Sequence, residues 1–244
     1  KQDKRIKKYL AKEHTLLYKA RKLALPKCSG EIICFLDVDD WWHTNKLERQ
    51  IEILKDKNID LVYSNFDLYN QTTNKYKSAF KDFLPSGNIL KSLLNFYCVG
   101  LSTIALRSKI LHDENITFDD SFNLIGDFDL VIQIAKKYKI FAIQDPLVFI
   151  RKHTESVSFN SRELYSIEMK RWIDKSKNDP ALSDSNFSNL ENAAIYSLVI
   201  SHILSGNKKK ALKLLINLKI NIQFFKAILM ILVPLNLVKY LNKI

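Results

Sequence analysis

The chain has 244 residues, 47% of them hydrophobic and 26% charged, which is enough to bury a substantial core and excludes a disordered sequence. Its formal charge of +12 indicates an anionic partner such as nucleic acid, anionic lipid or a phosphorylated substrate, without choosing among them. The cysteines, Cys28, Cys34 and Cys98, form neither a CxxC pair nor an even set. They argue against a disulfide scaffold or a structural zinc site and fit a reducing, cytoplasmic setting.

The first elements alternate between helix and strand. The chain begins KQDKRIKKYL, without Met and without a basic segment followed by an apolar one, so we expect an excerpt with no signal peptide. Apolar residues recur at helical spacing over 14–25, and EIICFL (31–36) is an apolar run typical of a strand covered on both faces. A helix over 44–57, with Thr44 as N-cap, and a strand or pair of strands over 60–70 follow. This order predicts an α/β layer architecture.

The alternation continues to about residue 153. We expect a helix over 86–96, a strand running into a helix over 102–111, and an amphipathic helix over 126–139. Short strands are expected on either side of Pro146. From about Ser161 every segment has helical periodicity, which predicts an all-helical C-terminal region over 161–244.

The last segment, Ile222 to Ile244, is strongly apolar but carries lysines and is interrupted by Pro234. The apolar stretch between Lys226 and Pro234 is far shorter than the roughly 20 residues that span a bilayer. Two interpretations remain open: a helix lying in the membrane interface, held by lysines to anionic lipid, or simple packing on the other helices.

Three carboxylates, Asp37, Asp39 and Asp40, follow the apolar run 31–36. At the carboxyl edge of an α/β sheet they would enter the crevice in which such sheets bind ligands. Carboxylates this close repel one another, and a hard divalent cation such as Mg²⁺ or Mn²⁺ relieves the repulsion while keeping positions open for phosphates. The alternative is an acidic loop that caps the next helix.

Three blocks carry a family resemblance. The block KARKLALPKCSGEIICFLDVDDWWHTNKLERQ (19–50) resembles the central segment of family 2 glycosyltransferases, in which an Ala-Arg-Asn helix, a Gly-Glu pair, an apolar strand, Asp-x-Asp-Asp and a Lys-Leu-Glu helix follow one another. LIGDFDLVIQIAKK (124–137) is similar to the family's Glu-Asp-x-Asp-Leu helix start, and FIRKHTESVS (149–158) to its Arg-x-His-x-x-Ser-x-Ser element. The resemblance covers about residues 1–160.

The resemblance implies a GT-A fold over 1–160, with a mostly parallel nucleotide-binding sheet that is incomplete at its N-terminus. It implies metal-assisted transfer of a sugar, with inversion, from a nucleotide-diphosphate sugar, expected to be UDP-linked, to a glycan or lipid-linked acceptor. The setting would be bacterial cell-surface polysaccharide or lipopolysaccharide synthesis, in the cytoplasm or on the inner face of the membrane. Nucleic acid is not expected, because the lysines are scattered without interleaved aromatic residues.

Carried over by position, the resemblance assigns Asp37 and Asp39 to the metal and the donor, with Asp40 as an alternative ligand. Asp127 is the base that accepts the proton of the attacking hydroxyl. The same carboxylate could instead be a helix N-cap, a role that Asp commonly has. Asp129 is expected to support the site or the helix start.

The remaining candidates lie outside the acidic cluster. His153 is expected to contact the diphosphate or complete the metal shell, and Arg151 to pair with the diphosphate through its planar guanidinium. Arg21, on the Ala-Arg helix, is expected to reach the nucleotide. Each also has a purely structural alternative. Trp41 and Trp42 offer a stacking face to sugar or base, or belong to the core.

Two departures from the family pattern limit the interpretation. The acidic residue that usually precedes the base is Gly126, which removes a charge near the acceptor. The family's opening strand and its Asp-Asp-Gly-Ser turn, which form the uracil and ribose half of the donor site, have no counterpart in this sequence. We therefore expect residues 1–244 alone to bind donor poorly. The alternative to an enzyme is an inactive remnant that acts as a binding or scaffold module.

Overall fold

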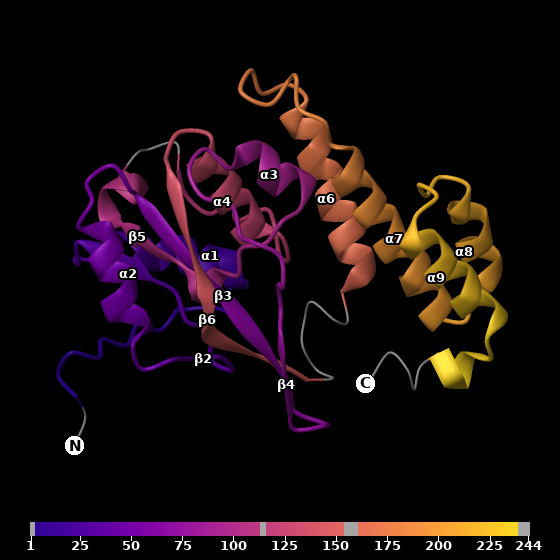
Figure 1. The fold of residues 1–244 in the computed structure, drawn as a ribbon, viewed down its shortest axis with the longest axis horizontal. Coiled ribbons are helices and arrows are strands. Elements are labelled where there is room, and N and C mark those ends of the chain that lie inside the picture. The colour runs from indigo at the N-terminus through magenta and orange to yellow at the C-terminus, as the bar shows by residue number, and fades with distance from the viewer. Residues whose placement is uncertain (1–2, 113–115, 154–160, 239–244) are drawn as a thin grey trace.

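The fold is described by a computed structural model, which covers residues 3–112, 116–153 and 161–238. Figure 1 shows a curled sheet with helices packed against it and a row of helices that extends to one side. The helices are α1 (Leu17–Ala24), α2 (Lys46–Leu54), α3 (Leu90–Asn95), α4 (Gly126–Ala135), α6 (Arg162–Ser176), α7 (Ser188–Leu204), α8 (Lys208–Leu215) and α9 (Ile222–Leu232), with 3₁₀ turns η1 (Leu25–Lys27), η2 (Leu101–Thr103) and η3 (Ser108–His112). The strands are β1 (Ile32–Cys34), β2 (Trp41–Trp42), β3 (Leu61–Asn70), β4 (Lys75–Ser78), β5 (Ala105–Arg107) and β6 (Ile140–Lys152).

The strands form one sheet in the order β1-β5-β3-β6-β2, with β4 paired to β3. The long central pair, β3 and β6, is parallel, with Leu61 opposite Ile140. The other described pairs, β1–β5, β3–β5, β3–β4 and β2–β6, are antiparallel. The predicted α/β class with a helical C-terminal region is confirmed, while the mostly parallel sheet is corrected to a mixed one.

Most of the antiparallel pairs join strands that are far apart in the sequence. Among the described pairs only β3 and β4 are joined by a short turn, which gives an antiparallel hairpin. β2 follows the acidic turn directly, but its antiparallel partner is the second half of β6, which comes much later in the chain. The direction of each short strand is therefore set by the tertiary fold and is not encoded in its own apolar pattern.

The structure has one strand, β6, where the sequence predicted short strands around Pro146. Proline lacks a backbone N–H, and the register between β3 and β6 shifts at Asn65, which faces Pro146. The Asn65 side chain compensates, because its Oδ1 accepts the N–H of Phe66 at 2.8 Å and its Nδ2 donates to the carbonyl of Phe80 at 2.9 Å. A bulge therefore accommodates the proline without ending the strand.

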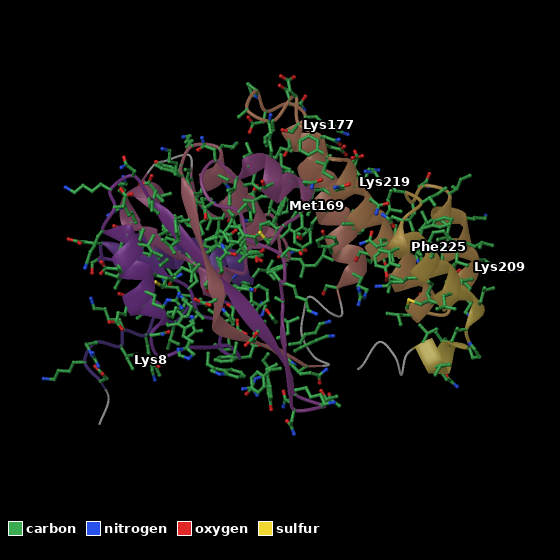
Figure 2. All side chains as sticks on the ribbon, viewed as in Figure 1. Lys8, Met169, Lys177, Lys209, Lys219 and Phe225 are labelled. Atoms are coloured by element: carbon green, nitrogen blue, oxygen red, sulfur yellow. The ribbon has the colours of Figure 1, made fainter. Side chains whose placement is uncertain are left out.

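The main core lies between the sheet, α4 and α6 and includes buried residues of the sheet, such as Tyr63 and Leu106, and of α6, such as Met169 and Trp172. Figure 2 shows side chains filling the space between the sheet and the helices, with Met169 on α6, and further side chains among α7, α8 and α9. The second cluster includes Ile200 of α7. The helices α6 and the start of α7 thus share the core of the sheet, and α8 and α9 pack on the end of α7. The domain boundary expected at residue 160 lies in 154–160, outside the described residues.

Helix α2 begins later than predicted. It starts at Lys46, and the N-cap position belongs to Asn45, whose side chain makes no cap bond but lies with Oδ1 2.8 Å from Nδ1 of His43. The prediction that Thr44 caps this helix is wrong. Helix α4 begins at Gly126 as predicted but ends at Ala135 and not at residue 139. The helix expected over 86–96 is limited to α3, and the helical part expected after the strand in 102–111 is the 3₁₀ turn η3. In the part of the chain that the structure describes, no helix combines the length and apolar character needed to cross a membrane.

Candidate active site

The acidic cluster forms a tight turn between β1 and β2. The N–H of Asp40 donates to the carbonyl of Asp37 at 3.1 Å, and Val38 at the tip is fully exposed. Ser102 of η2 anchors the turn through its hydroxyl group. Its Oγ donates to Oδ2 of Asp40 at 2.7 Å and accepts the N–H of Asp37 at 3.3 Å. The turn is thus open on its outer side and anchored on its inner side.

The end of β6 brings two predicted residues to this turn. Nε2 of His153 lies 3.1 Å from Oδ2 of Asp39. The backbone N–H of Arg151 donates to Oδ1 of Asp40 at 3.2 Å, and its Nε donates to the carbonyl of Asp39 at 3.1 Å. Residues more than 110 positions apart in sequence therefore share one site, as the family resemblance implies.

The two tryptophans have different roles. Trp41 stacks on Phe149 with ring centroids 5.3 Å apart, and the guanidinium carbon of Arg151 lies 5.3 Å from the Trp41 ring centroid. Trp42 is structural, because its indole N–H donates to the carbonyl of Ser102 at 2.9 Å and the Nζ of buried Lys46 lies 4.2 Å from its ring centroid. Only Trp41 remains a candidate for contact with donor or acceptor.

Arg21 connects the acidic turn to α4. Its guanidinium forms a close ion pair with Oδ1 of Asp37, and its Cζ lies 5.4 Å from the ring centroid of Tyr18. The Arg21 side chain is 14% exposed and that of Asp37 44%, so the pair sits at the rim of the site. Tyr18 in turn donates from its hydroxyl to Oδ1 of Asp127 at 3.1 Å and to the carbonyl of Leu124 at 3.0 Å.

Asp127 lies in the first turn of α4, as predicted. Its Oδ1 also accepts the backbone N–H of Phe128 at 2.8 Å. Burial raises the pKa of Asp127, against the lowering effects of the Phe128 N–H, the Tyr18 hydroxyl and the Arg21 charge. A position at a helix N-terminus favours the anionic form of a carboxyl group. For Asp127 burial outweighs that effect and makes the carboxylate a stronger proton acceptor.

The glycine that departs from the family pattern has a packing reason. A Cβ on Gly126 would lie 2.5 Å from Cγ of Tyr18 and 2.7 Å from both Cδ atoms of the same ring. The Tyr18 ring also stacks on Phe118, with ring centroids 5.7 Å apart, and its hydroxyl is bonded to Asp127, so its position is fixed by several contacts. An acidic side chain at 126 and a tyrosine at 18 are therefore mutually exclusive in this arrangement.

The three carboxylates of the acidic turn are not equally suited to hold a divalent cation. Among residues 3–112, 116–153 and 161–238, no three His, Cys, Asp or Glu side chains gather as a metal-binding group. Asp39 and His153 lie together with an oxygen and a nitrogen at 3.1 Å, which suits two ligands of one ion with phosphate oxygens completing the shell. Asp37 is paired with Arg21, and Asp40 is held by Ser102 and Arg151. Burial raises the pKa of Asp40.

Two residues of the site were missed by sequence reasoning. Ser102 lies 62 positions after Asp40, and nothing local in CVGLST marks it as a partner of the acidic turn. Tyr18 could have been found, because it lies one helical turn before Arg21 on the same face of α1. The predicted site residues lie together at the edge of the sheet where β1 and β6 end. They are Arg21, Asp37, Asp39, Asp40, Asp127, Arg151 and His153.

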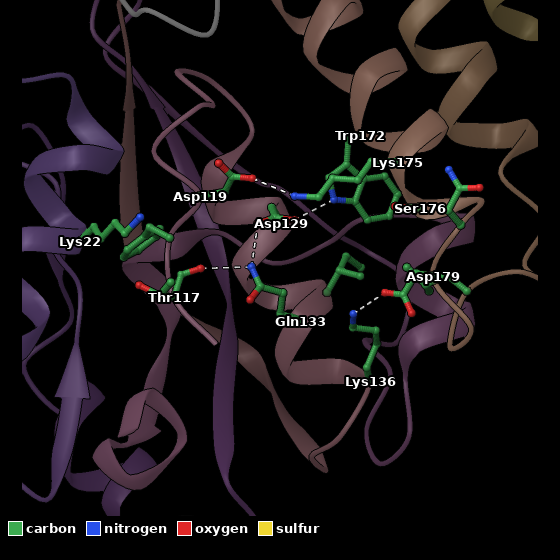
Figure 3. A pocket seen from close by; sticks show the side chains of 14 residues that line it. Lys22, Thr117, Asp119, Asp129, Gln133, Lys136, Trp172, Lys175, Ser176 and Asp179 are labelled. Atoms are coloured by element: carbon green, nitrogen blue, oxygen red, sulfur yellow. Dashed lines mark hydrogen bonds and ion pairs between the residues drawn. The ribbon is translucent and has the colours of Figure 1, made fainter. Parts of the chain in front are cut away.

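Asp129 belongs to a different place. Its Oδ1 accepts the indole N–H of Trp172 at 2.8 Å and its Oδ2 accepts Nε2 of Gln133 at 2.7 Å. It lines a cleft of about 470 Å³ between α4 and α6, shown in Figure 3. Ion pairs between Lys175 and Asp119 at 3.0 Å and between Lys136 and Asp179 at 2.6 Å cross this cleft. The cleft is a polar seam that holds α6 on α4, so the side-chain contacts of Asp129 described here join these two helices and do not reach the acidic turn.

Comparison with known proteins agrees with this arrangement. The family described as glycosyl transferase family 2 matches residues 1–113. A UDP-Glc:alpha-D-GlcNAc-diphosphoundecaprenol beta-1,3-glucosyltransferase of Escherichia coli, WfgD, is 30% identical over 195 residues, which are 79% of this chain and 68% of that protein. The chain belongs to glycosyl transferase family 2.

Other relatives are longer. An uncharacterised glycosyltransferase of Rickettsia conorii is 28% identical over 226 residues, which are 93% of this chain and 36% of that protein. The chain spans 36%, 30% and 24% of the Rickettsia relatives it matches. Among solved structures, residues 1–349 of TarS from S. aureus align with a TM-score of 0.49 and 15% identity, over 88% of this chain and 59% of that one.

Proposed function

We propose that the protein transfers a sugar from a nucleotide-diphosphate sugar to an acceptor hydroxyl with inversion, in the synthesis of a bacterial surface polysaccharide or lipopolysaccharide. The observation that carries the proposal is the position of Arg21 between the acidic turn and the Tyr18–Asp127 pair. Arg21 links the acidic turn, whose residues suit the binding of a leaving diphosphate, to Asp127, whose carboxylate suits the acceptance of a proton. Membership of glycosyl transferase family 2 and similarity to the glucosyltransferase WfgD support the reaction class.

In this mechanism Asp127 accepts the proton of the attacking hydroxyl at its carboxylate. The raised pKa increases the driving force for that transfer. Tyr18 and the Phe128 N–H hold Oδ1, so the carboxylate is oriented before the acceptor arrives. The donor is expected to be UDP-linked and the acceptor a glycan or lipid-linked glycan.

At the donor end, Arg151 would pair with the diphosphate through its guanidinium, which Trp41 stacks against and the Asp39 carbonyl orients. Asp39 and His153 are the residues that would hold Mg²⁺ or Mn²⁺, with Asp37 next to them and Asp40 supporting the turn. Such an ion supplies positive charge to the oxygens of the leaving diphosphate. Arg21 would keep the Asp37 carboxylate in place through their ion pair.

The test is Asp127→Asn in the full-length protein, assayed for sugar transfer, with Asp120→Asn as control. Asp120 is exposed and paired with Lys22, away from the turn. Transfer should fall by about 100-fold or more in Asp127→Asn and remain in the control. Retained transfer in Asp127→Asn would reject the base.

The second candidate is an inactive binding or scaffold module, because this chain spans only part of its longer relatives. A full-length protein that carries all the site residues and yet transfers no sugar from any nucleotide donor would favour it. We place the active protein in the cytoplasm, working at the inner face of the membrane where lipid-linked acceptors are found.

A further inference from the structure

Helix α9 has apolar side chains on the face that is turned to solvent. The exposed fractions are 68% for Ile222, 59% for Phe225, 63% for Leu229 and 76% for Leu232. These positions are i, i+3, i+7 and i+10, so they form a single stripe along the helix. We call these four residues the α9 stripe. A helix in water normally carries polar residues on such a face, so the stripe needs a partner.

The stripe is not the face that stabilises the fold. The opposite side of α9 carries buried Ala227 and the partly buried Phe224 and Ile228, which pack into the cluster shared with α7 and α8. Lys208 donates to the carbonyls of Ile231 and Val233 at 2.6 Å each and so closes the end of the helix. The packing that holds α9 in place therefore leaves the stripe outside.

The charge around the stripe has one sign. From residue 192 to the end of the sequence there are eight lysines and no Asp, Glu or Arg, whereas all 26 acidic residues of the chain precede residue 192. Lys209 and Lys213 of α8 and Lys226 of α9 are exposed. Lys209 and Phe225 both lie in the part of the molecule away from the sheet (Figure 2).

We propose that the α9 stripe and these lysines form a docking surface for an anionic lipid bilayer, with α9 lying in the plane of the interface. Apolar side chains enter the boundary between headgroups and acyl chains, and lysines pair with the acidic headgroups. A second copy of this chain fits less well, because a symmetric contact through the stripe would bring together the lysines of α8 and α9, and these two helices contain no acidic residue to offset them. The proposal does not depend on the reaction proposed above.

The experiment is cosedimentation of the 244-residue chain with vesicles of phosphatidylcholine alone and of equal parts phosphatidylcholine and phosphatidylglycerol. Binding is expected to the anionic vesicles only, and to weaken as salt is raised. Phe225→Gln with Leu229→Gln should lower the affinity by about tenfold or more. Lys213→Gln with Lys226→Gln should lower it by about 25-fold, roughly fivefold for each lysine.

Matched controls separate this surface from the general attraction of a basic protein to anionic vesicles. Phe83→Gln with Ile167→Gln removes two equally exposed apolar side chains elsewhere. Lys81→Gln with Lys91→Gln removes two exposed lysines outside the C-terminal helices. Both control variants should bind like the unmodified chain, and circular dichroism checks that each variant is folded.

Three outcomes would overturn the proposal. The first is absence of binding to anionic vesicles at low salt, and the second is an equal loss of binding in the control and α9 variants. The third is self-association of the chain in sedimentation velocity that Phe225→Gln with Leu229→Gln abolishes, in the absence of vesicle binding. That last result would assign the stripe to a second copy.

Discussion

The ring of Tyr18 fills the space next to Gly126 in which any side chain at that position would begin. The same tyrosine donates its hydroxyl to Asp127, the residue that follows the glycine. One aromatic side chain therefore replaces the acidic neighbour that the family pattern has at residue 126 and orients the carboxylate beside it. Two predictions follow from this pair.

Gly126→Ala should destabilise the protein by about 1–3 kcal/mol, because the new methyl group overlaps a ring whose position is fixed by several contacts. Alanine otherwise favours a helix over glycine, so a loss of stability isolates the clash. The measurement is urea unfolding of Gly126→Ala, Tyr18→Ala and the double variant. The double variant should lose clearly less stability than the sum of the single losses, and simple additivity would count against the overlap.

Tyr18→Phe keeps the ring and removes the hydroxyl that donates to Asp127. The anionic carboxylate then loses a stabilising hydrogen bond, so the pKa of Asp127 should rise further. If Asp127 is the base, the acidic limb of the pH–rate profile of kcat/KM in the full-length protein moves to higher pH. Tyr63→Phe is the control, since it removes a similar hydroxyl that donates to Pro85 at 2.9 Å, and its profile should not move.

The three carboxylates of the acidic turn should respond differently to amide substitution. Asp39→Asn should weaken Mn²⁺ binding, followed by electron paramagnetic resonance, because Asp39 lies beside His153. Asp40→Asn should mainly lower the free energy of unfolding, by about 1–3 kcal/mol, since it disturbs the bonds to Ser102 and Arg151. Equal loss of Mn²⁺ binding in both variants would contradict the division of roles.

Lys46 makes the stability of the protein depend on pH. Burial lowers the pKa of Lys46 from 10.5 to about 8. Below pH 8 the amine is charged in both the folded and the unfolded chain, and the folded chain bears the full cost of burying that charge. As pH rises from 8 towards 10.5 the folded chain releases the proton first, so this group adds stability, by about 3 kcal/mol at most.

The check is urea unfolding of the protein and of Lys46→Met at about pH 7 and about pH 10. Stability relative to Lys46→Met should rise with pH. Burial also raises the pKa of the Cys34 thiol. The contribution of this thiol to the stability of the protein therefore falls as pH rises, opposite to the contribution of Lys46. Both proteins should therefore carry Cys34→Ala. A stability difference that stays flat with pH would contradict the assignment.

Strong local patterns predicted where most of the helices and strands lie along the chain. The apolar run before the acidic turn and the helical period after Gly126 correspond to β1 and α4, because burial of an apolar face decides both. Strand directions were not predictable, since β2 and β5 pair with strands that lie far from them in the sequence. Pro146 misled the interpretation because the residue that compensates for it, Asn65, lies on another strand.

The candidate site was predictable to the extent that its residues lie in three motif blocks. Family resemblance supplied Asp37, Asp39, Asp127 and His153, and the structure gathers them at one edge of the sheet. The pairing of each side chain was not predictable. Ser102 has no motif, and the link from Arg21 to Asp37 competes with the metal role that the motif assigns to that carboxylate. Such choices depend on distances that only the fold defines.

The anchoring of the acidic turn has a consequence for folding. Its contacts join residues far apart in the sequence, 62 positions from Asp40 to Ser102 and 114 from Asp39 to His153. Contacts of this kind are expensive in loop entropy and form late. During synthesis the turn therefore emerges from the ribosome long before the strand that shapes it, and the site is complete only after β6 has been made and has paired along β3.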